Sequence, residues 1–77
     1  MSEAYVLLNV NFKEQKRIIE EAQRIPTVKT AKTVYGIYDI LIVLESTNLQ
    51  ELKNAIDIDI NRIKGIDNLT TLISVSN

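Results

Sequence analysis

The sequence predicts an α+β domain whose four strands and two helices follow the order β-α-β-β-α-β. Two observations predict this order. Short β-branched apolar runs alternate with longer charged segments in which apolar residues recur every three or four positions. One proline and two glycines stand close to the points where these segments change. Seventy-seven residues suffice for one small domain, which we expect to span residues 1–77.

The spacing of the apolar residues changes between the first strand and the first helix. Residues 4–10 are short and apolar and predict a strand, whereas residues 11–24 predict a helix. Asn11 is placed to cap this helix, and Glu14 three positions on resembles a capping box. Pro26 ends the helix. The apolar stripe of this helix is expected to consist of Phe12, Ile18, Ile19, Ala22 and Ile25.

The next two strands are predicted over residues 27–35, which are rich in threonine and valine, and over residues 38–45. The second of these segments is the most apolar in the chain. Gly36 and Ile37 lie between them, so we expect a hairpin with a short turn.

The second helix is expected to begin after Asn48, which is a candidate N-cap, and to be closed by Gly65 in a left-handed conformation. Residues 66–75 then predict the fourth strand. This order is typical of the ferredoxin-like fold, in which two helices cover one face of a four-stranded antiparallel sheet. The helix should present to the sheet the residues Leu49, Leu52, Ile56, Ile60 and Ile63.

The two halves of the chain resemble each other. Residues 24–28 are similar to residues 62–66, thirty-eight positions later. Two β-α-β halves would produce such an internal similarity, which supports the predicted fold.

Both faces of the first and third strands are apolar. Tyr5 and Leu7 point away from the side of Ala4, Val6 and Leu8, and Leu41 and Val43 alternate in the same way with Ile40, Ile42 and Leu44. Exposed apolar side chains on a second face invite association. Long loops could cover that face instead, but we expect none in this chain. The pattern therefore favours a dimer formed sheet to sheet.

The composition excludes several kinds of site. The chain has no cysteine and no histidine, so it forms no disulfide and no thiolate zinc site and lacks the usual general base near neutral pH. Asp57 and Asp59 lie two positions apart on a helix and do not face each other, so we expect them on a solvated face. We expect no catalytic residue, no metal and no cofactor.

Charge and hydropathy limit the partners. Nine basic and ten acidic side chains give no overall attraction to nucleic acid. The longest near-continuous apolar run covers residues 40–44, far short of the roughly 20 residues of a membrane span. The N-terminal residues lack the basic stretch of a secretory signal. We expect a cytoplasmic protein with no membrane partner.

The cluster at residues 34–39 is the most informative one. Gly36 permits positive φ and lets a ligand approach the backbone. Tyr35 directly precedes Gly36, and Tyr38 directly precedes Asp39. Asp39 stands at the start of an apolar strand, where a carboxylate needs a partner. It either caps the turn, or takes the ammonium group of a zwitterion whose carboxylate is held by neighbouring amides.

Thr71 is a further candidate because it shares one face of the last strand with Leu69, Ile73 and Val75. A hydroxyl in such a row needs a partner. It either covers a polar edge or lines a small-molecule pocket.

Two segments of the chain, residues 25–31 and 34–41, resemble the signature of the Lrp/AsnC effector domain, also called the RAM domain. The second segment contains Gly36 and Asp39, which form a G-x-x-D element of that signature. The stretch from Ile63 to Val75 resembles the end of the same signature. Thr27 and Leu69 depart from the resemblance, since the family has glycine and threonine there.

The resemblance implies a ferredoxin-like domain that forms homodimers through its sheets and assembles into octamers or decamers. It also implies effectors, usually amino acids, bound between dimers. Carried over to this sequence, the ligand-binding positions are Tyr35, Gly36, Tyr38, Asp39 and Thr71.

The helix-turn-helix domain of typical members has no counterpart in these residues. We therefore expect a stand-alone amino-acid-binding and oligomerisation module linked to transcription regulation, without direct DNA binding, with which full-length regulators could co-assemble. Two alternatives stay open. A small dimeric αβ-barrel enzyme, of monooxygenase or isomerase type, would rely on Asp39. An RNA-binding module of RRM type would use Tyr5, Tyr35 and Tyr38.

Overall fold

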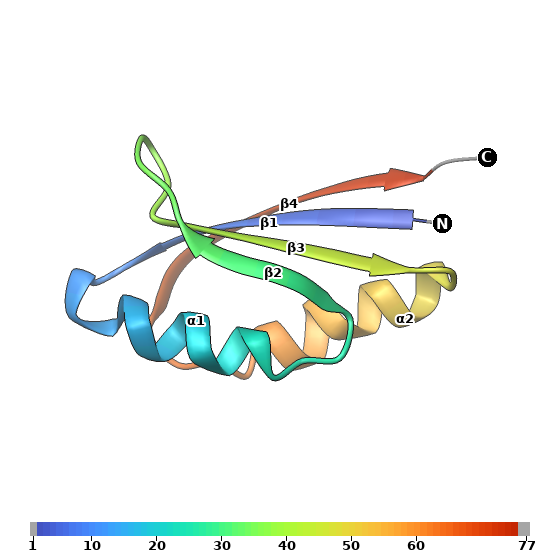
Figure 1. Cartoon of the computed structure of the whole chain (residues 1–77), viewed down its shortest axis with the longest axis horizontal. Helices are drawn as coiled ribbons and strands as arrows, with labels where there is room; N and C mark the ends of the chain where they lie inside the picture. The colour runs from blue at the N-terminus through green and yellow to red at the C-terminus, as the bar shows by residue number, and fades with distance from the viewer. Residues whose placement is uncertain (1, 76–77) are drawn as a thin grey trace.

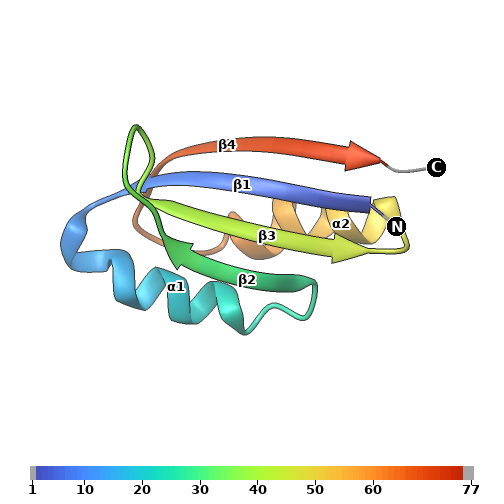
Figure 2. The same cartoon turned by 45° about the horizontal axis from the view of Figure 1, so that its top comes forward.

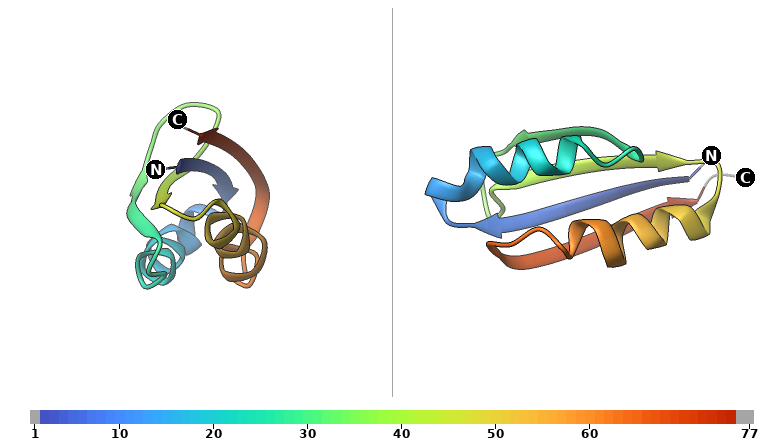
Figure 3. Two further views of the ribbon diagram at one scale, coloured as in Figure 1. Left: turned by 90° about the vertical axis from the view of Figure 1, so that its right-hand side faces the viewer. Right: turned by 90° about the horizontal axis from the view of Figure 1, so that it is seen from below.

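Four antiparallel strands form one sheet in the order β2-β3-β1-β4, and both helices cover the same face of it (Figure 1). The computed structural model describes residues 2–75 and confirms the predicted ferredoxin-like α+β fold. Figure 3 shows the two helices side by side beneath the sheet. The elements are β1 (Ser2–Val10), a 3₁₀ turn η1 (Phe12–Glu14), α1 (Gln15–Gln23), β2 (Val28–Thr33), β3 (Ile40–Ser46), α2 (Leu49–Asn54), a π-helical segment η2 (Ala55–Ile60) and β4 (Ile66–Val75).

The core lies between the sheet and the helices. Strand residues alternate between the two faces, so every second residue of β1 and β3 is buried beneath the helices. Of the residues that the helical period assigned to the core, Ile18, Ala22, Leu52, Ile56, Ile60 and Ile63 are buried, whereas Ile19, Ile25 and Leu49 are half-buried. The fully buried large side chains are Val6, Leu8, Ile18, Ile40, Ile42, Leu44, Leu52 and Ile60.

The other face of the sheet, which we call the open face, carries no helix (Figure 2). In the strand register Leu7 lies opposite Leu41, and Tyr5 lies opposite Val43. These four side chains are half-buried by their neighbours, and Leu72 of β4, opposite Tyr5, is 57% exposed. The prediction that both faces of β1 and β3 are apolar is confirmed.

The start of the first helix differs from the prediction. Asn11 does cap it, since its side chain accepts a hydrogen bond from the amide of Lys13 at 3.0 Å. The Glu14 carboxylate does not return to Asn11 but accepts from Arg17. Phe12 is 82% exposed, so its assignment to the buried stripe was wrong. It lies in the 3₁₀ turn η1, where the period differs from that of the helix that follows.

The second helix changes to a π-helix after Asn54 and ends at Ile60. The side-chain amide of Asn61 donates to the carbonyls of Ile56 and Asp57, and the carbonyls of Ile58 and Ile60 accept from the amides of Arg62 and Ile63. Gly65 has φ 97° as expected for a left-handed residue. It lies in the connection to β4, however, and does not close the helix directly.

The β2–β3 connection is also longer than the expected short turn, because it runs from residue 34 to residue 39. The amide of Asp39 donates to the carbonyl of Leu8 at 2.9 Å, whereas its carbonyl accepts from Val34. Asp39 is therefore held by β1 as well as by the end of β2. The loop projects on the side of the sheet opposite the helices (Figure 1).

Removing the cap of α2 should lower stability measurably. The Asn48 side chain accepts from the amides of Gln50 at 2.9 Å and Glu51 at 3.2 Å. We expect Asn48→Ala to reduce the free energy of unfolding by about 1 kcal/mol. Urea denaturation at fixed protein concentration measures this change. Asn48→Asp keeps the acceptor and should stay near the wild-type value, and equal losses in both variants would contradict the capping role.

Within residues 2–75, no helix is both long enough and apolar enough to cross a membrane.

Candidate functional site

A pocket of about 290 Å³ lies where the β2–β3 loop meets the end of β1 and the start of the first helix. Four of the five predicted ligand-binding residues line it, namely Tyr35, Gly36, Tyr38 and Asp39. The pocket arises because the loop crosses over the end of the sheet, where β1 leaves it for the helix layer. Its other lining residues are Val10, Phe12, Gln15, Thr33 and Val34.

The Asp39 carboxylate is anchored to β1. Its Oδ2 accepts a hydrogen bond from the backbone amide of Val10 at 3.0 Å and a longer one from the side-chain amide of Asn9 at 3.5 Å. The same Asn9 amide donates to the carbonyl of Ile37 at 2.7 Å. Asp39 thus stabilises the loop, in agreement with the predicted role in the turn, and it does so through contacts to β1. Both contacts use Oδ2, so Oδ1 has no hydrogen bond within residues 2–75.

Part of the loop backbone has donors without a partner. Within the described chain, the amides of residues 35–38 donate to no protein acceptor, whereas those of Val34 and Asp39 do. Gly36 has φ 140°, and a Cβ built there would meet nothing within 4 Å. Glycine is therefore required by the backbone conformation and not by lack of space. Tyr35, Gly36 and Tyr38 line the same pocket as Asp39. Free amides and a free carboxylate oxygen in one pocket can bind an anionic and a cationic group together.

The tyrosines of the loop differ in their surroundings. The Tyr38 hydroxyl is 3.3 Å from Thr70 Oγ1, a hydrogen bond that joins the loop to β4. Tyr35 is 98% exposed and Ile37 is 85% exposed. Tyr35 and the exposed Phe12 line the pocket and form an apolar rim, whereas Ile37 belongs to the same loop but does not line the pocket. Such a rim is suited to contact with a ligand or with a second protein molecule.

Thr71 is not part of this pocket. In the register it lies opposite Val6, so it shares the helix-covered face, whereas Thr70 lies opposite Leu7 on the open face. The alternation that grouped Thr71 with Leu69 and Ile73 was right. The same alternation puts Thr70 on the open face, where it contacts Tyr38 but does not line the pocket either.

Asn9 and Val10 are the other site residues that the sequence reasoning missed. An asparagine at the end of an apolar strand gives little indication of a long-range contact. Within residues 2–75, no group of acidic side chains is placed so that it could hold a metal ion.

Comparison with known protein families gives one match. The model of the Lrp/AsnC ligand binding domain matches residues 3–77. No protein with a curated functional description matches the sequence.

Solved structures share the fold. A hypothetical protein, PHS023 from Pyrococcus horikoshii, superposes with a TM-score of 0.91 at 27% identity, over 100% of this chain and 93% of that one. AsnC from E. coli gives 0.85 at 19% identity, over 99% of this chain and 52% of its own. A transcriptional regulator from Neisseria meningitidis, NMB0573, solved as an L-Met complex, gives 0.80 at 10% identity, over 97% and 50% of the two chains. This chain therefore spans about half of each of these two regulators.

Proposed function

The chain belongs to the Lrp/AsnC ligand binding domain family, and from that membership we propose that it is a single amino-acid-binding module, over residues 1–77, that acts in regulation in the cytoplasm and is not an enzyme. The observation that carries the proposal is that Tyr35, Gly36 and Tyr38, whose amides have no acceptor within the described chain, line one pocket with Asp39. The Neisseria regulator solved with L-Met has the same fold. An amino acid is the simplest effector that matches both kinds of group in the pocket.

In the proposed binding mode, each charged group of the effector has its own partner in the pocket. The effector ammonium donates to Oδ1 of Asp39, while Oδ2 keeps its hydrogen bond to Val10. The effector carboxylate accepts from the amides of residues 35–38, which have no acceptor within the described chain. Hydrogen bonds that involve ionised groups are stronger than neutral ones. Both charges of a zwitterion are then satisfied without any further charged side chain.

The side chain of the effector is proposed to lie against the apolar rim. Phe12 and Tyr35, which line the pocket, are largely exposed, so in a single chain this part of the pocket is open. We propose that a second copy of the chain covers it, in an assembly of dimers such as an octamer or a decamer. The dimer itself would form through the open face of the sheet, where Leu7, Leu41, Tyr5 and Val43 gather.

Removing the charge of Asp39 should weaken the binding of the effector and not the fold. Wild-type protein is expected to show a saturable rise in melting temperature with at least one of the common amino acids at millimolar concentration, since a ligand that binds only the folded state stabilises it. In Asp39→Asn, which keeps the size of the side chain, we expect the affinity to fall roughly tenfold or more because a charge-assisted hydrogen bond is lost. Thermal scanning and calorimetry measure both effects.

Asp67→Asn is the matched control, because Asp67 is exposed on β4 and does not line the pocket. It should bind the effector as the wild type does. Absence of a shift with every amino acid, or an equal loss in both variants, would contradict the proposal.

A further inference from the structure

Asn9, near the end of β1, is hydrogen-bonded to two residues of the β2–β3 loop. Its side-chain amide donates to the carbonyl of Ile37 at 2.7 Å and, over a longer 3.5 Å, to Oδ2 of Asp39. The alternation along β1 puts Asn9 on the open face with Leu7, which is the side on which the loop projects (Figure 1). One side chain of an inner strand therefore contacts the loop at two places.

The two acceptors require an amide group at position 9. A backbone carbonyl and an ionised carboxylate accept hydrogen bonds and donate none. The side-chain nitrogen of asparagine carries two hydrogens, so it can donate to both acceptors. An aspartate of the same shape would place a second carboxylate against them, and a leucine would donate nothing. The contact thus depends on the chemistry of asparagine and not on its size alone.

The middle of the loop has no other backbone anchor. Within residues 2–75, the bond from Asn9 to the Ile37 carbonyl is the only hydrogen bond that the backbone of residues 35–38 makes. The side chains of Tyr35 and Ile37 are almost fully exposed, so they do not fix the segment by packing. Tyr38 is half-buried and is held to β4 through its hydroxyl group. The backbone hydrogen bonding of the segment that carries the free amides therefore depends on Asn9.

The pairing of β1 with β4 is irregular at the same place. Asn9 pairs with Asn68, whereas Val10 pairs with Ile66, so the register skips one residue of β4. Such bulges bend a strand and re-aim its side chains, and they are frequent beside active sites. The next amide of β1, that of Val10, donates to Oδ2 of Asp39 at 3.0 Å. The end of β1 thus supplies donors to one oxygen of this carboxylate and to the middle of the loop.

We propose that Asn9 is the positioning residue of the loop pocket. By holding the Ile37 carbonyl it fixes the backbone whose amides meet the carboxylate of the effector, and it donates to the Asp39 oxygen that does not face the ammonium. Asn9 itself does not line the pocket. A loop that is already ordered loses less conformational entropy on binding, which raises affinity. This role rests on the function proposed for the pocket.

The two contacts of Asn9 predict unequal effects on the two charges of an effector. Asp39 keeps its shorter hydrogen bond from Val10 when the Asn9 amide is removed. The Ile37 carbonyl has no second donor within the described chain. Loss of the Asn9 amide should therefore disturb the site of the effector carboxylate more than the site of its ammonium.

The first test is ¹⁵N relaxation of the unliganded protein, which reports backbone motion on the picosecond to nanosecond timescale. In Asn9→Leu, which keeps the branched shape of the side chain, we expect residues 35–38 to become more mobile while the strands stay as ordered as in the wild type. Asn9→Ala, which adds no apolar surface, should give the same result. Unchanged relaxation of residues 35–38 in both variants would overturn the proposal.

The second test is calorimetry with L-methionine and with 3-(methylthio)propylamine, which is methionine without its carboxylate. Asn9→Leu should bind L-methionine roughly tenfold more weakly than the wild type, because the order of the loop is lost. The preference for L-methionine over the amine should shrink severalfold. A general loss of stability would weaken both compounds alike, so an equal loss for the two, or no loss for L-methionine, would overturn the proposal.

Asn68→Leu is the matched control. Asn68 lies opposite Asn9 in the register, is exposed, and makes no hydrogen bond to the loop within residues 2–75. This variant should keep the relaxation of the loop and the affinity of the wild type, and a loss equal to that of Asn9→Leu would reject the role of Asn9.

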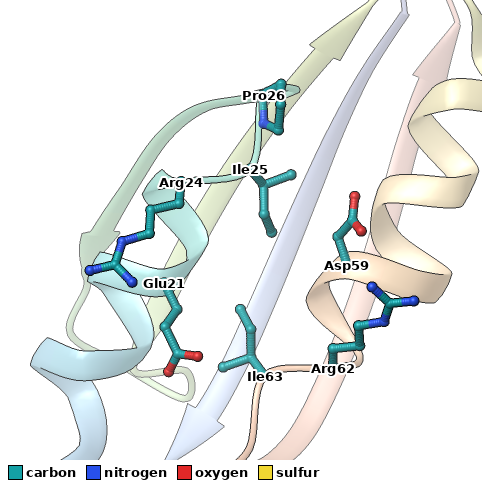
Figure 4. Close-up of a pocket in the computed structure, with 7 residues that line it drawn as sticks. All are labelled: Glu21, Arg24, Ile25, Pro26, Asp59, Arg62 and Ile63. Atoms are coloured by element: carbon teal, nitrogen blue, oxygen red, sulfur yellow. The ribbon is translucent and has the colours of Figure 1, made fainter.

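A pocket of about 330 Å³ between the end of α1 and η2 gives an internal reference (Figure 4). It shares no lining residue with the loop pocket. The amides of Ile25 and Ile63, which line it, should relax identically in the wild type and all variants.

Failure of every amino acid to bind the wild type would reject the function proposed for the pocket. The relaxation of the unliganded variants would then still confirm or overturn that Asn9 holds the loop. Binding to the wild type with no change in the Asn9 variants would reject the role of Asn9 alone.

Discussion

Leu41→Lys is expected to separate the proposed sheet-to-sheet dimer into monomers while leaving the fold intact. Leu41 lies at the centre of the open face, opposite Leu7 of β1 and Lys32 of β2. Losing the burial of one leucine costs about 1.5–3 kcal/mol. A two-fold interface loses it twice, so the dimer should weaken by roughly a hundredfold or more. Light scattering after size exclusion, with native mass spectrometry, measures the change.

The matched control places the same substitution on the other layer of the molecule. Ile58 is 46% exposed on η2 and points away from both the core and the open face. Ile58→Lys should therefore keep the wild-type mass in solution. Circular dichroism should report an unchanged fold for both variants, since Leu41 is only half-buried in the single chain. A monomeric wild type at micromolar concentration, or an assembled Leu41→Lys variant, would contradict the sheet-to-sheet dimer.

Leu8→Ala is expected to have the largest effect on stability. Leu8 is fully buried and lies on the helix-covered face of the central strand β1. Removing a large aliphatic side chain from a core costs about 2–5 kcal/mol, because both burial and packing are lost. A domain of this size has a total stability of only about 5–15 kcal/mol. The melting temperature should fall by roughly 10 °C or more.

The neighbouring residue gives the control for this prediction. Leu7 has the same side chain on the same strand but points to the open face. In urea denaturation at a concentration where the protein is monomeric, Leu7→Ala should cost much less than Leu8→Ala. Similar costs for the two variants would show that the open face contributes as much as the core and would contradict the layered description.

The order of the elements was predictable because each carries a local signal. Alternation marks β1 and β3, and the helical period marks the residues that the helices bury. Pro26 and Asn48 mark where a helix ends and where one begins. These signals lie within a few residues of the structures they specify. Phe12 was misplaced because a short 3₁₀ turn leaves no trace in an apolar pattern.

The candidate site was less predictable because its contacts are long-range. The Gly36–Asp39 element pointed to the loop, but the donor to Asp39 is an amide of β1, and any residue type carries an amide. Thr70 could not be preferred to Thr71 without knowing that Tyr38 reaches β4. Asp59 was expected on a solvated face but is half-buried, because it lies three positions after the buried Ile56 and four before the buried Ile63.

The pairing of β1 with β4 has a consequence for the folding kinetics. The register pairs Ser2 with Val75, so the first and the last strand in the sequence are hydrogen-bonded neighbours in the sheet. Nearly the entire chain must be closed into a loop before that ladder can form, and the entropy of closure precedes the gain from its contacts. The helices and the β2–β3 pair are local and can form early. We expect the rate-limiting step of folding to be the docking of β4 onto β1.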